Sequence, residues 1–303
     1  MKKMLVTGGT VFVSRCVARY FSDKFDVYVL NRNTRTQCPG VNLIEGDRHN
    51  LGSKLCGYHF DAVLDITAYN AEDVNDLLDA LNSFGDYILI SSSAVYPETA
   101  PQPFTEETPT APNKFWGKYG VGKIAAEKAL MSRVPGAYVL RPPYLYGPGN
   151  NVYREAFVFD CAMQGRPFIL PGDGSMKLQF FHVGDLCRFI QTILKEHPRQ
   201  QIFNVGNRDT VTVREWVWAC YEAAAKTPEF VTIDSNVEQR NYFPFYNYEY
   251  TLDVEKQSAL MTDTKLLTEG LRESLAWYME NSNEVRKKPF FSYIDCNFEV
   301  YPL

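Results

Sequence analysis

The sequence predicts an α/β protein with a doubly wound parallel sheet and a smaller C-terminal α+β cap domain. In the first half, short apolar runs alternate with amphipathic segments of helical period, which is the pattern of repeated strand-helix units. The runs are apolar at consecutive positions, as in strands that helices cover on both faces. After residues 147–149 (Gly-Pro-Gly) helices dominate and an aromatic-rich irregular region appears. We therefore expect a sheet domain over 1–150, with a return segment from about 180–210, and a cap over 151–303.

The expected elements follow in order along the chain. Strands of the sheet domain are expected at 4–6, 26–30, 41–44, 62–66, 87–90 and 137–140, with helices at 12–22, 71–83 and 119–132. The second half is expected to contribute helices at 152–164, 184–195, 213–225 and 271–281, and strands at 167–170, 202–205 and 229–233. Because ligands of such sheets bind outside the carboxyl ends of the strands, the site is expected there.

Composition and charge narrow the function classes. The chain of 303 residues carries 36 acidic and 31 basic side chains, and its net charge of −5 disfavours a nucleic-acid partner. Its seven cysteines form no C-x-x-C pair and its four histidines lack ligand spacing, so we expect neither disulfides nor a metal. No signal peptide or apolar stretch of about 18 residues is visible, which predicts a cytoplasmic protein without membrane contact.

A glycine turn between the first strand and the first helix is the first candidate binding element. Thr7-Gly8-Gly9-Thr10 begins this turn, whose free N–H groups and helix N-terminus suit a pyrophosphate. The predicted contacts of a dinucleotide here are Gly8, Gly9, Thr10, Phe12 and Val13. The full pattern T-G-x-x-G-x-x-G has glycine where this chain has Val11 and Ser14, and the valine is expected to narrow the phosphate approach. A structural turn without a ligand is the alternative interpretation.

The ends of the second and third strands indicate which dinucleotide is bound. An acidic residue after the second strand would hold the ribose 2′-hydroxyl of NAD, whereas arginines pair with the 2′-phosphate of NADP. Here Asn31 is followed by Arg32 and Arg35, which favours NADP without excluding NAD. Asp47 and Arg48, after the third strand, are expected to flank the adenine. The alternative for the two arginines is a solvated basic loop.

A tyrosine and a lysine four residues apart begin the helix expected at 119–132. Residues at this spacing share a helix face, so the Lys123 ammonium can approach the Tyr119 phenol and favour its phenolate form. A tyrosine that loses its proton near neutral pH can act as the base in redox chemistry on an alcohol or ketone. A second match, Tyr20-x-x-x-Lys24, ends the first helix away from any strand terminus and is assigned no role. The serines at 91–93 follow a strand about 25 residues upstream, and one of them can hold the substrate oxygen.

Six short motifs together resemble one known family. They are Thr7-Gly8-Gly9-Thr10, Ser91-Ser92-Ser93-Ala94-Val95-Tyr96, Tyr119-x-x-x-Lys123, Leu140-Arg141-Pro142-Pro143-Tyr144-Leu145-Tyr146-Gly147-Pro148-Gly149, Phe181-His182-Val183-Gly184-Asp185-Leu186 and Phe203-Asn204-Val205. The motifs occur in the same order in the extended and atypical short-chain dehydrogenase/reductases, also called the NAD-dependent epimerase/dehydratase family. The chain resembles this family over about residues 3–280. The resemblance implies a Rossmann-type sheet, a bound NAD or NADP and a small, sugar-like substrate.

The resemblance also implies roles for individual residues. Aligned on Val95-Tyr96, the catalytic hydroxyl is Ser92, and Tyr119 and Lys123 complete the triad. Further cofactor contacts are implied at Thr67, Ala68, Tyr69, Ser91, Pro142, Pro143 and Tyr144. The expected function is an NAD(P)-dependent oxidoreductase or epimerase that acts on a hydroxyl or keto carbon.

Departures from the family pattern restrict the substrate. Sugar-nucleotide 4,6-dehydratases carry an acidic pair where this chain has Ser93 and Ala94, so elimination of water is not expected. Leu178 stands where sugar-nucleotide epimerases hold the diphosphate with an arginine, and Tyr144 replaces a common asparagine. Both departures argue against a UDP- or dTDP-sugar substrate. An atypical branch of the family, which includes chloroplast stem-loop RNA-binding proteins, resembles this chain most in four motifs. They are Gly9-Thr10-x-Phe12, Asn31-Arg32-x-x-Arg35, Gly46-Asp47-Arg48 and Leu178-Gln179-Phe180-Phe181-His182-Val183. A non-redox protein that binds RNA or a regulatory ligand is therefore the alternative, and the sequence leaves a homodimer open.

Overall fold

Three separate stretches of chain build the first of two units in this fold. In the computed structural model, which describes residues 1–233 and 237–298, the first unit comprises Met1–Pro143, Val183–Arg208 and Leu252–Thr264. The second unit comprises Tyr144–His182, Asp209–Thr251 and Lys265–Leu303. Across the described ranges, no helix combines the length and the apolar character needed to cross a membrane.

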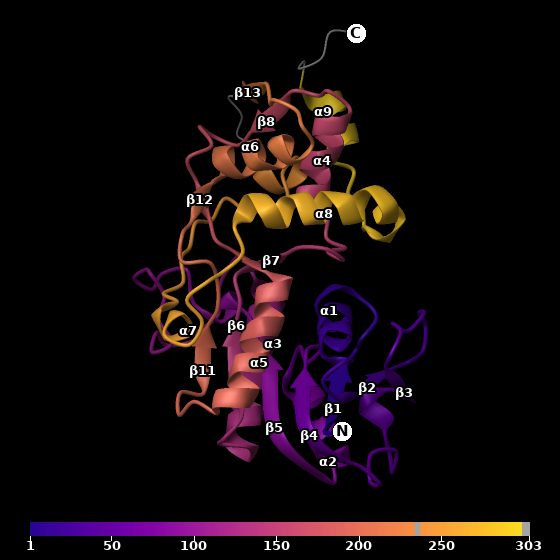
Figure 1. Ribbon diagram of the computed structural model, residues 1–303. Helices are drawn as coiled ribbons and strands as arrows, with labels where there is room; N and C mark the ends of the chain where they lie inside the picture. The colour runs from indigo at the N-terminus through magenta and orange to yellow at the C-terminus, as the bar shows by residue number, and fades with distance from the viewer. Residues whose placement is uncertain (234–236, 299–303) are drawn as a thin grey trace. The chain divides into compact units, whose positions relative to one another are not determined.

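A seven-stranded parallel sheet forms the centre of the first unit (Figure 1). Its strands are β1 (Lys3–Thr7), β2 (Asp26–Asn31), β3 (Asn42–Glu45), β4 (His59–Asp65), β5 (Ser83–Ile90), β6 (Tyr138–Arg141) and β11 (Ile202–Asn204). They lie in the order β11-β6-β5-β4-β1-β2-β3, and every pairing is parallel. The chain thus builds outward from β1 to β3 and then returns to the other side of β1 with β4. At such a reversal the carboxyl ends of neighbouring strands open a crevice for ligands.

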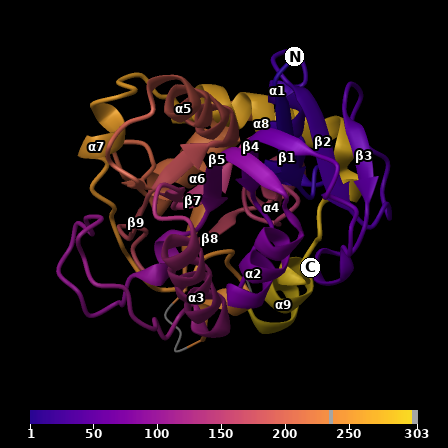
Figure 2. The same ribbon diagram turned by 90° about the horizontal axis from the view of Figure 1, so that it is seen from below.

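Helices cover both faces of this sheet, as Figure 2 shows from below. Helices α1 (Phe12–Phe21) and α5 (Val183–Glu196) pack together on one face, and α2 (Ala71–Ala80) and α3 (Gly117–Arg133) on the other. The predicted fold class is confirmed. Helix α2 begins with a reciprocal cap between Asn70 and Asp73, but it ends earlier than predicted. It stops at Ala80 because Ser83 already pairs with His59 of β4 as the first residue of β5.

The second unit combines helices with three short strand pairs. Its helices are α4 (Glu155–Met163), α6 (Val213–Ala223), α8 (Leu267–Asn281) and α9 (Phe290–Asn297). Its pairs are β7 (Tyr144–Tyr146) with β10 (Phe180–His182), β8 (Phe168–Leu170) with β13 (Phe230–Thr232), and β9 (Lys177–Leu178) with β12 (Val211–Thr212). Aromatic side chains such as Phe157, Trp216 and Phe243 fill its interior. The sequence did not predict β7, β9, β10 and β12, because strands this short leave no readable period.

Candidate active site

The turn after β1 requires glycine at two successive positions. Gly8 and Gly9 have φ angles of 90° and 93°, a region that L side chains rarely adopt. A Cβ on Gly9 would lie 2.5 Å from Cγ1 of Val29, and one on Gly8 would lie 2.9 Å from Oγ of Ser14. The Asn31 amide donates to the Gly8 carbonyl at 2.6 Å and ties the turn to the end of β2. The turn therefore carries no side chain at these two positions, and of the two glycines only Gly8 lines the cavity described below.

Val11 and Ser14 replace glycines without disturbing this turn. Val11 has a φ of −133°, an extended conformation open to any residue, and it precedes the first residue of α1. Ser14 is buried, and its hydroxyl donates to the Val11 carbonyl at 2.9 Å. Phe12 and Val13 open the helix, and Phe12 has a φ of 35°. Positive φ at a non-glycine residue stores about 1 kcal/mol or more, as is common at functional sites.

A cavity of about 400 Å³ opens at the carboxyl ends of the first four strands. The predicted cofactor contacts that line it are Gly8, Thr10, Asn31, Arg32, Arg35, Asp47, Arg48, Thr67 and Tyr69. Thr7, Leu30, Thr34, Gly46 and His49 complete the lining, and Val11 is not part of it. The expected obstruction by Val11 is thus not seen among the lining residues. Arg32 and Arg35 are both exposed, and within residues 1–233 and 237–298 neither forms an ion pair.

A buried polar cluster stands behind this cavity. The Asp65 carboxylate is fully buried and accepts hydrogen bonds from Thr7 Oγ1 (2.8 Å) and Tyr87 Oη (2.8 Å). Arg48 Nη2 donates to both Asp65 oxygens, at 2.9 and 3.0 Å. Burial opposes the Arg48 charge, but the Asp65 carboxylate outweighs burial and raises the pKa of this guanidinium. Arg48, predicted from sequence to flank the adenine, is anchored by an acid that the sequence analysis did not single out.

Helix α3 places Lys123 inside the protein and Tyr119 at its surface. The Lys123 ammonium is buried and donates to the carbonyls of Ala68 (2.7 Å) and Ile90 (2.8 Å). Burial lowers the pKa of Lys123 to about 8. Its Nζ lies 6.0 Å from the ring centroid of Tyr119 and 5.0 Å from that of Tyr69. Tyr119 is 42% exposed, so the buried Lys123 ammonium lies beside a partly exposed tyrosine ring.

Two glycines between Tyr119 and Lys123 allow α3 to approach its neighbours closely. A Cβ on Gly120 would lie 2.5 Å from the carbonyl oxygen of Ala94, and one on Gly122 would lie 2.2 Å from that of Tyr69. Real Cβ atoms do not approach backbone this closely, so only glycine fits at either position. The helix is therefore held against two segments at once, the turn after β5 and the turn after β4 that lines the cavity. This role was not predicted, although two glycines inside a helix are an unusual signal.

Of the three serines at 91–93, Ser92 is the one that is not fully buried. Ser91 is buried and donates its hydroxyl to Glu127, and Ser93 is buried as well. Ser92 is half-buried, and its Oγ accepts a hydrogen bond from the Ala94 N–H at 3.2 Å. Because Ala94 touches Gly120, the residue next to Tyr119, the predicted Ser92 lies in the turn that contacts the tyrosine end of α3.

A buried network of hydrogen bonds links α3, β6 and the residues that follow β5. Arg141 donates to both oxygens of Glu127 (3.0 and 2.6 Å) and to Tyr96 Oη at 2.8 Å. Tyr96 in turn donates to Asn204 Oδ1 at 2.7 Å, and the Asn204 N–H donates to Glu106 at 2.8 Å. Burial raises the pKa of Tyr96 to about 12. Arg141 and Asn204, both part of the sequence motifs, therefore form hydrogen bonds that hold the first unit together.

The other predicted cofactor contacts fall outside the cavity lining, and Gly9, Phe12, Val13 and Ser91 are among them. Ala68 is buried and reaches Lys123 through its carbonyl, and the Pro142 carbonyl accepts the Ser93 N–H at 2.9 Å. Pro143 ends the first segment of the first unit. Tyr144 belongs to the second unit, where its buried ring packs 4.6 Å from that of Phe245. Their contact with a cofactor stays a prediction.

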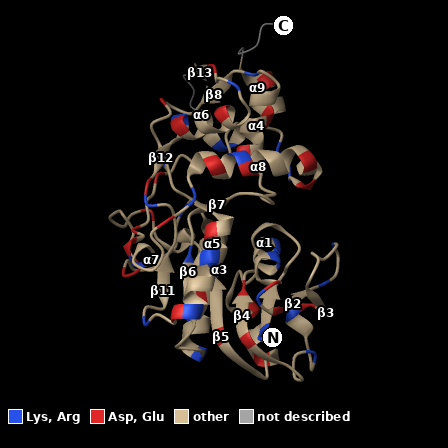
Figure 3. Cartoon of the chain, viewed as in Figure 1, with Lys and Arg blue, Asp and Glu red and all other residues tan. Residues whose placement is uncertain are grey.

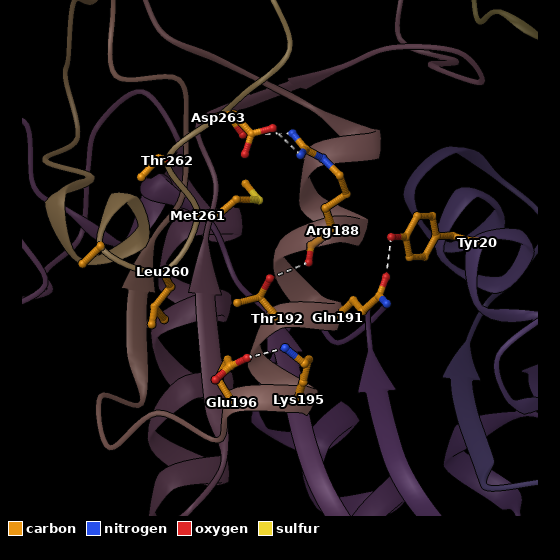
Figure 4. A pocket seen from close by; sticks show the side chains of 11 residues that line it. Tyr20, Arg188, Gln191, Thr192, Lys195, Glu196, Leu260, Met261, Thr262 and Asp263 are labelled. Atoms are coloured by element: carbon orange, nitrogen blue, oxygen red, sulfur yellow. Dashed lines mark hydrogen bonds and ion pairs between the residues drawn. The ribbon is translucent and has the colours of Figure 1, made fainter.

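A second cavity of the first unit, about 620 Å³, lies between α1, α5 and residues 259–263 (Figure 4). Several polar side chains around it are paired with one another. Tyr20 donates to Gln191 at 2.5 Å, and Arg188 Nη1 pairs with Asp263 at 2.9 Å. Tyr20, the tyrosine of the second Y-x-x-x-K match, is thus engaged in a helix contact, and we assign this cavity no ligand.

The family of this chain follows from comparison with known proteins. The family model described as NAD dependent epimerase/dehydratase family matches residues 4–206. The chain belongs to this family. It is 29% identical to the chloroplast stem-loop binding protein of 41 kDa b of Arabidopsis thaliana, over 90% of this chain and 78% of that protein. It is 27% identical to the probable GDP-L-fucose synthase 1 of Oryza sativa subsp. japonica, over 78% of this chain and 76% of that protein.

Solved structures agree on the fold. The dTDP-glucose 4,6-dehydratase of Bacillus anthracis, solved in complex with NAD, superposes with a TM-score of 0.73 at 20% identity. The match covers 94% of this chain and 99% of that chain. The resemblance inferred from the six motifs is therefore confirmed, as is membership of an enzyme family of epimerases and dehydratases.

Proposed function

We propose that this protein binds NAD or NADP in the 400 Å³ cavity of the first unit and catalyses redox chemistry on a sugar-like substrate. The reacting centre is a hydroxyl or keto carbon, with Ser92, Tyr119 and Lys123 as the catalytic residues. The observation that carries the proposal is the pair of close contacts made by Gly120 and Gly122. These contacts hold the helix of the Tyr-Lys pair against both the Ser92 turn and the lining of the cavity.

The residues around the cavity suit a dinucleotide. Gly8 and Gly9 leave bare backbone at the helix N-terminus, where a pyrophosphate gains from N–H donors and the helix dipole. Arg32 and Arg35 line the same cavity and have no carboxylate partner in the described part of the chain. Guanidinium groups bind phosphate bidentately, so the pair supports NADP over NAD. When bound, the nicotinamide supplies the oxidising or reducing equivalent for the substrate carbon.

The three catalytic residues divide the remaining work. The Ser92 hydroxyl holds the substrate oxygen, and the Tyr119 phenol exchanges the proton of that oxygen. The buried Lys123 ammonium lies near the phenol and favours its ionised form. Lys123 is itself held by two backbone carbonyls, so its position is fixed before substrate arrives.

A nucleotide sugar is the substrate class that the relatives favour. The names of two of them, a probable GDP-L-fucose synthase and a dTDP-glucose 4,6-dehydratase, refer to nucleotide-linked sugars. The missing acidic pair at Ser93 and Ala94 argues against elimination of water here. We therefore expect epimerisation or oxidoreduction.

Tyr119→Phe tests this proposal. The variant should lose turnover on a panel of UDP-, GDP- and dTDP-sugars while its affinity for NAD and NADP, measured by calorimetry, changes less than threefold. Tyr20→Phe is the matched control, because it removes the same hydroxyl from the other Y-x-x-x-K match and should keep full turnover. Full turnover by Tyr119→Phe would rule out the assignment.

One observation favours a second candidate function. The relative with 29% identity is named for stem-loop binding, and the match covers 90% of this chain. Against RNA binding stand the net charge of −5 and the mixing of acidic and basic side chains on helices such as α5 and α8 (Figure 3). Retention of a stem-loop RNA that weakens steeply with salt, without turnover of any nucleotide sugar, would support this alternative.

A further inference from the structure

A single histidine connects two walls of the 400 Å³ cavity in the first unit. His49 lies in the short helix η1 (Arg48–Asn50), which follows β3, and it lines the cavity. Its Nδ1 lies 2.7 Å from Oδ2 of Asp76, and its Nε2 lies 3.2 Å from Oδ1 of Asp73. Both acids belong to α2, which begins after the turn that follows β4. The imidazole ring therefore joins the segment after β3 to the segment after β4.

Only the protonated ring can donate to both carboxylates. A neutral imidazole carries one N–H, so one of its nitrogens would face a carboxylate oxygen with no proton between them. The hydrogen bond to Asp76 is the largest cause that raises the pKa of His49, and the charges of three α2 acids raise it further. Two of these acids are Asp73 and Asp76, and the third is Glu72 in the first turn of α2. The geometry and the surrounding charge thus both favour the imidazolium form.

The charged neighbours of His49 in the chain have partners of their own. Arg48 pairs with the buried Asp65 at the end of β4. The Asp47 carboxylate accepts the backbone N–H of His49 at 3.1 Å and caps η1. The positive charge of the His49 ring is therefore balanced by α2.

Asp73 extends this contact to the residues that line the cavity. Its Oδ2 accepts the backbone N–H groups of Tyr69 at 2.7 Å and Asn70 at 3.2 Å, while its Oδ1 faces His49. Tyr69 lines the cavity, as His49 does. One buried carboxylate thus holds a lining residue from each of two segments that follow different strands.

We propose that His49 is a positioning residue whose proton fixes two walls of the dinucleotide cavity, so that cofactor affinity falls as the pH rises above neutrality. We call His49, Asp73 and Asp76 together the His49 clamp. Because the folded protein raises the pKa of His49 above its ordinary value of 6.5, the clamp is complete at pH 6. It is lost as the pH rises through the raised pKa. The identity of the ligand rests on the proposed function, whereas the clamp itself belongs to the free protein.

Calorimetric titration with NAD and with NADP at pH 6 and pH 9 tests the coupling. His49→Gln keeps one N–H donor but cannot be protonated. The unaltered protein should bind about three- to fivefold more tightly than His49→Gln at pH 6, since partly exposed ion pairs contribute modestly, and equally at pH 9. His197→Gln is the matched control, because His197 faces Asp86 at 3.2 Å and does not line the cavity; it should bind as the unaltered protein does. An advantage over His49→Gln that does not fall between pH 6 and pH 9 would overturn the proposal.

Asp76→Asn separates a positioning role from simple attraction between the imidazolium and the phosphates. If His49 acts through the clamp, this variant should bind NAD more weakly at pH 6, because the ring loses one of its two anchors. If Asp76 only repels the anionic dinucleotide, its removal should strengthen binding, and that result would refute the clamp.

Nuclear magnetic resonance of the imidazole C–H groups supplies a readout that needs no turnover. The signal of His49 is identified by its absence from His49→Gln. Its pKa should rise by about half a unit when NAD saturates the protein, because linkage between proton and ligand is reciprocal. An unchanged pKa in the presence of bound NAD would contradict the coupling.

Failure of this inference can be distinguished from failure of the proposed function. If neither cofactor binds at either pH, the proposed function fails, and the clamp is judged in the free protein. There the pKa of His49 should fall toward 6.5 in Asp76→Asn, and an unchanged value would refute the clamp. If binding depends on His49 as described while Tyr119→Phe keeps full turnover, the role of His49 stands and the catalytic assignment fails.

Discussion

The close contact at Gly122 predicts an unusual result for a glycine-to-alanine change in a helix. Alanine normally stabilises a helix interior by about 1 kcal/mol relative to glycine. Here the new Cβ would lie 2.2 Å from the carbonyl oxygen of Tyr69, whereas ordinary contacts begin at 3.4 Å, so backbone must move by about 1 Å. Overpacking against rigid backbone costs about 3 kcal/mol. Gly122→Ala should therefore lower the free energy of unfolding by about 2 kcal/mol.

Urea denaturation followed by circular dichroism measures this change. Gly136→Ala is the matched control, because nothing lies within 4 Å of a Cβ on Gly136 in the turn before β6. Its stability should stay the same or rise by up to about 1 kcal/mol. A shift of 1 Å also displaces Tyr119 and Lys123, and misplacement on this scale lowers kcat/KM by about 100-fold. If Gly122→Ala is as stable and as active as Gly136→Ala, α3 is not held against Tyr69 and the reasoning fails.

Three predictions concern charged side chains of the first unit. Combined Arg32→Gln and Arg35→Gln changes should weaken NADP binding at least tenfold and leave NAD binding nearly unchanged, as calorimetry can measure; equal losses for both cofactors would contradict a 2′-phosphate contact. Burial lowers the pKa of Lys123 from its ordinary value of 10.5 to about 8, so between these pH values the unfolded chain binds more protons than the folded one. Unfolding free energy should therefore rise from pH 8 to 10.5 by about 3 kcal/mol relative to Lys123→Met, and a difference that is constant with pH would contradict this. Glu127→Gln leaves the buried Arg141 charge without a counter-charge and should cost about 3–5 kcal/mol in urea denaturation, whereas a loss under about 1 kcal/mol would mean that the pair behaves as an exposed one.

Local sequence patterns were sufficient for the fold and for much of the cavity. Each strand from β1 to β6 was predicted within a few residues, because buried parallel strands are short apolar runs between helical segments. Gly8, Thr10, Asn31, Arg32, Arg35, Asp47 and Arg48 line the cavity as predicted, because each lies at or just after the end of a strand of the parallel sheet. Thr67 and Tyr69 line it too, and these two were chosen through the resemblance to a family. Ser92 was chosen from three serines only through the resemblance to a family.

Pairings across long stretches of chain could not be predicted. Asp65 accepts hydrogen bonds from Arg48 and from Thr7, which lies 58 residues away in the sequence. No local period of the sequence indicates partners at such distances. The resemblance to a family placed Tyr144 among the cofactor contacts, and the residue belongs to the second unit, which the sequence did not indicate. Local sequence therefore predicted the helices and strands well, but it did not predict which side chains contact one another.

Native mass spectrometry of the purified protein, before and after addition of NAD and NADP, tests the central claim most directly. The account predicts one dinucleotide per chain, either retained from the cell or acquired on addition, with NADP the more tightly held. A chain that keeps its bare mass in the presence of millimolar NAD and NADP would contradict it.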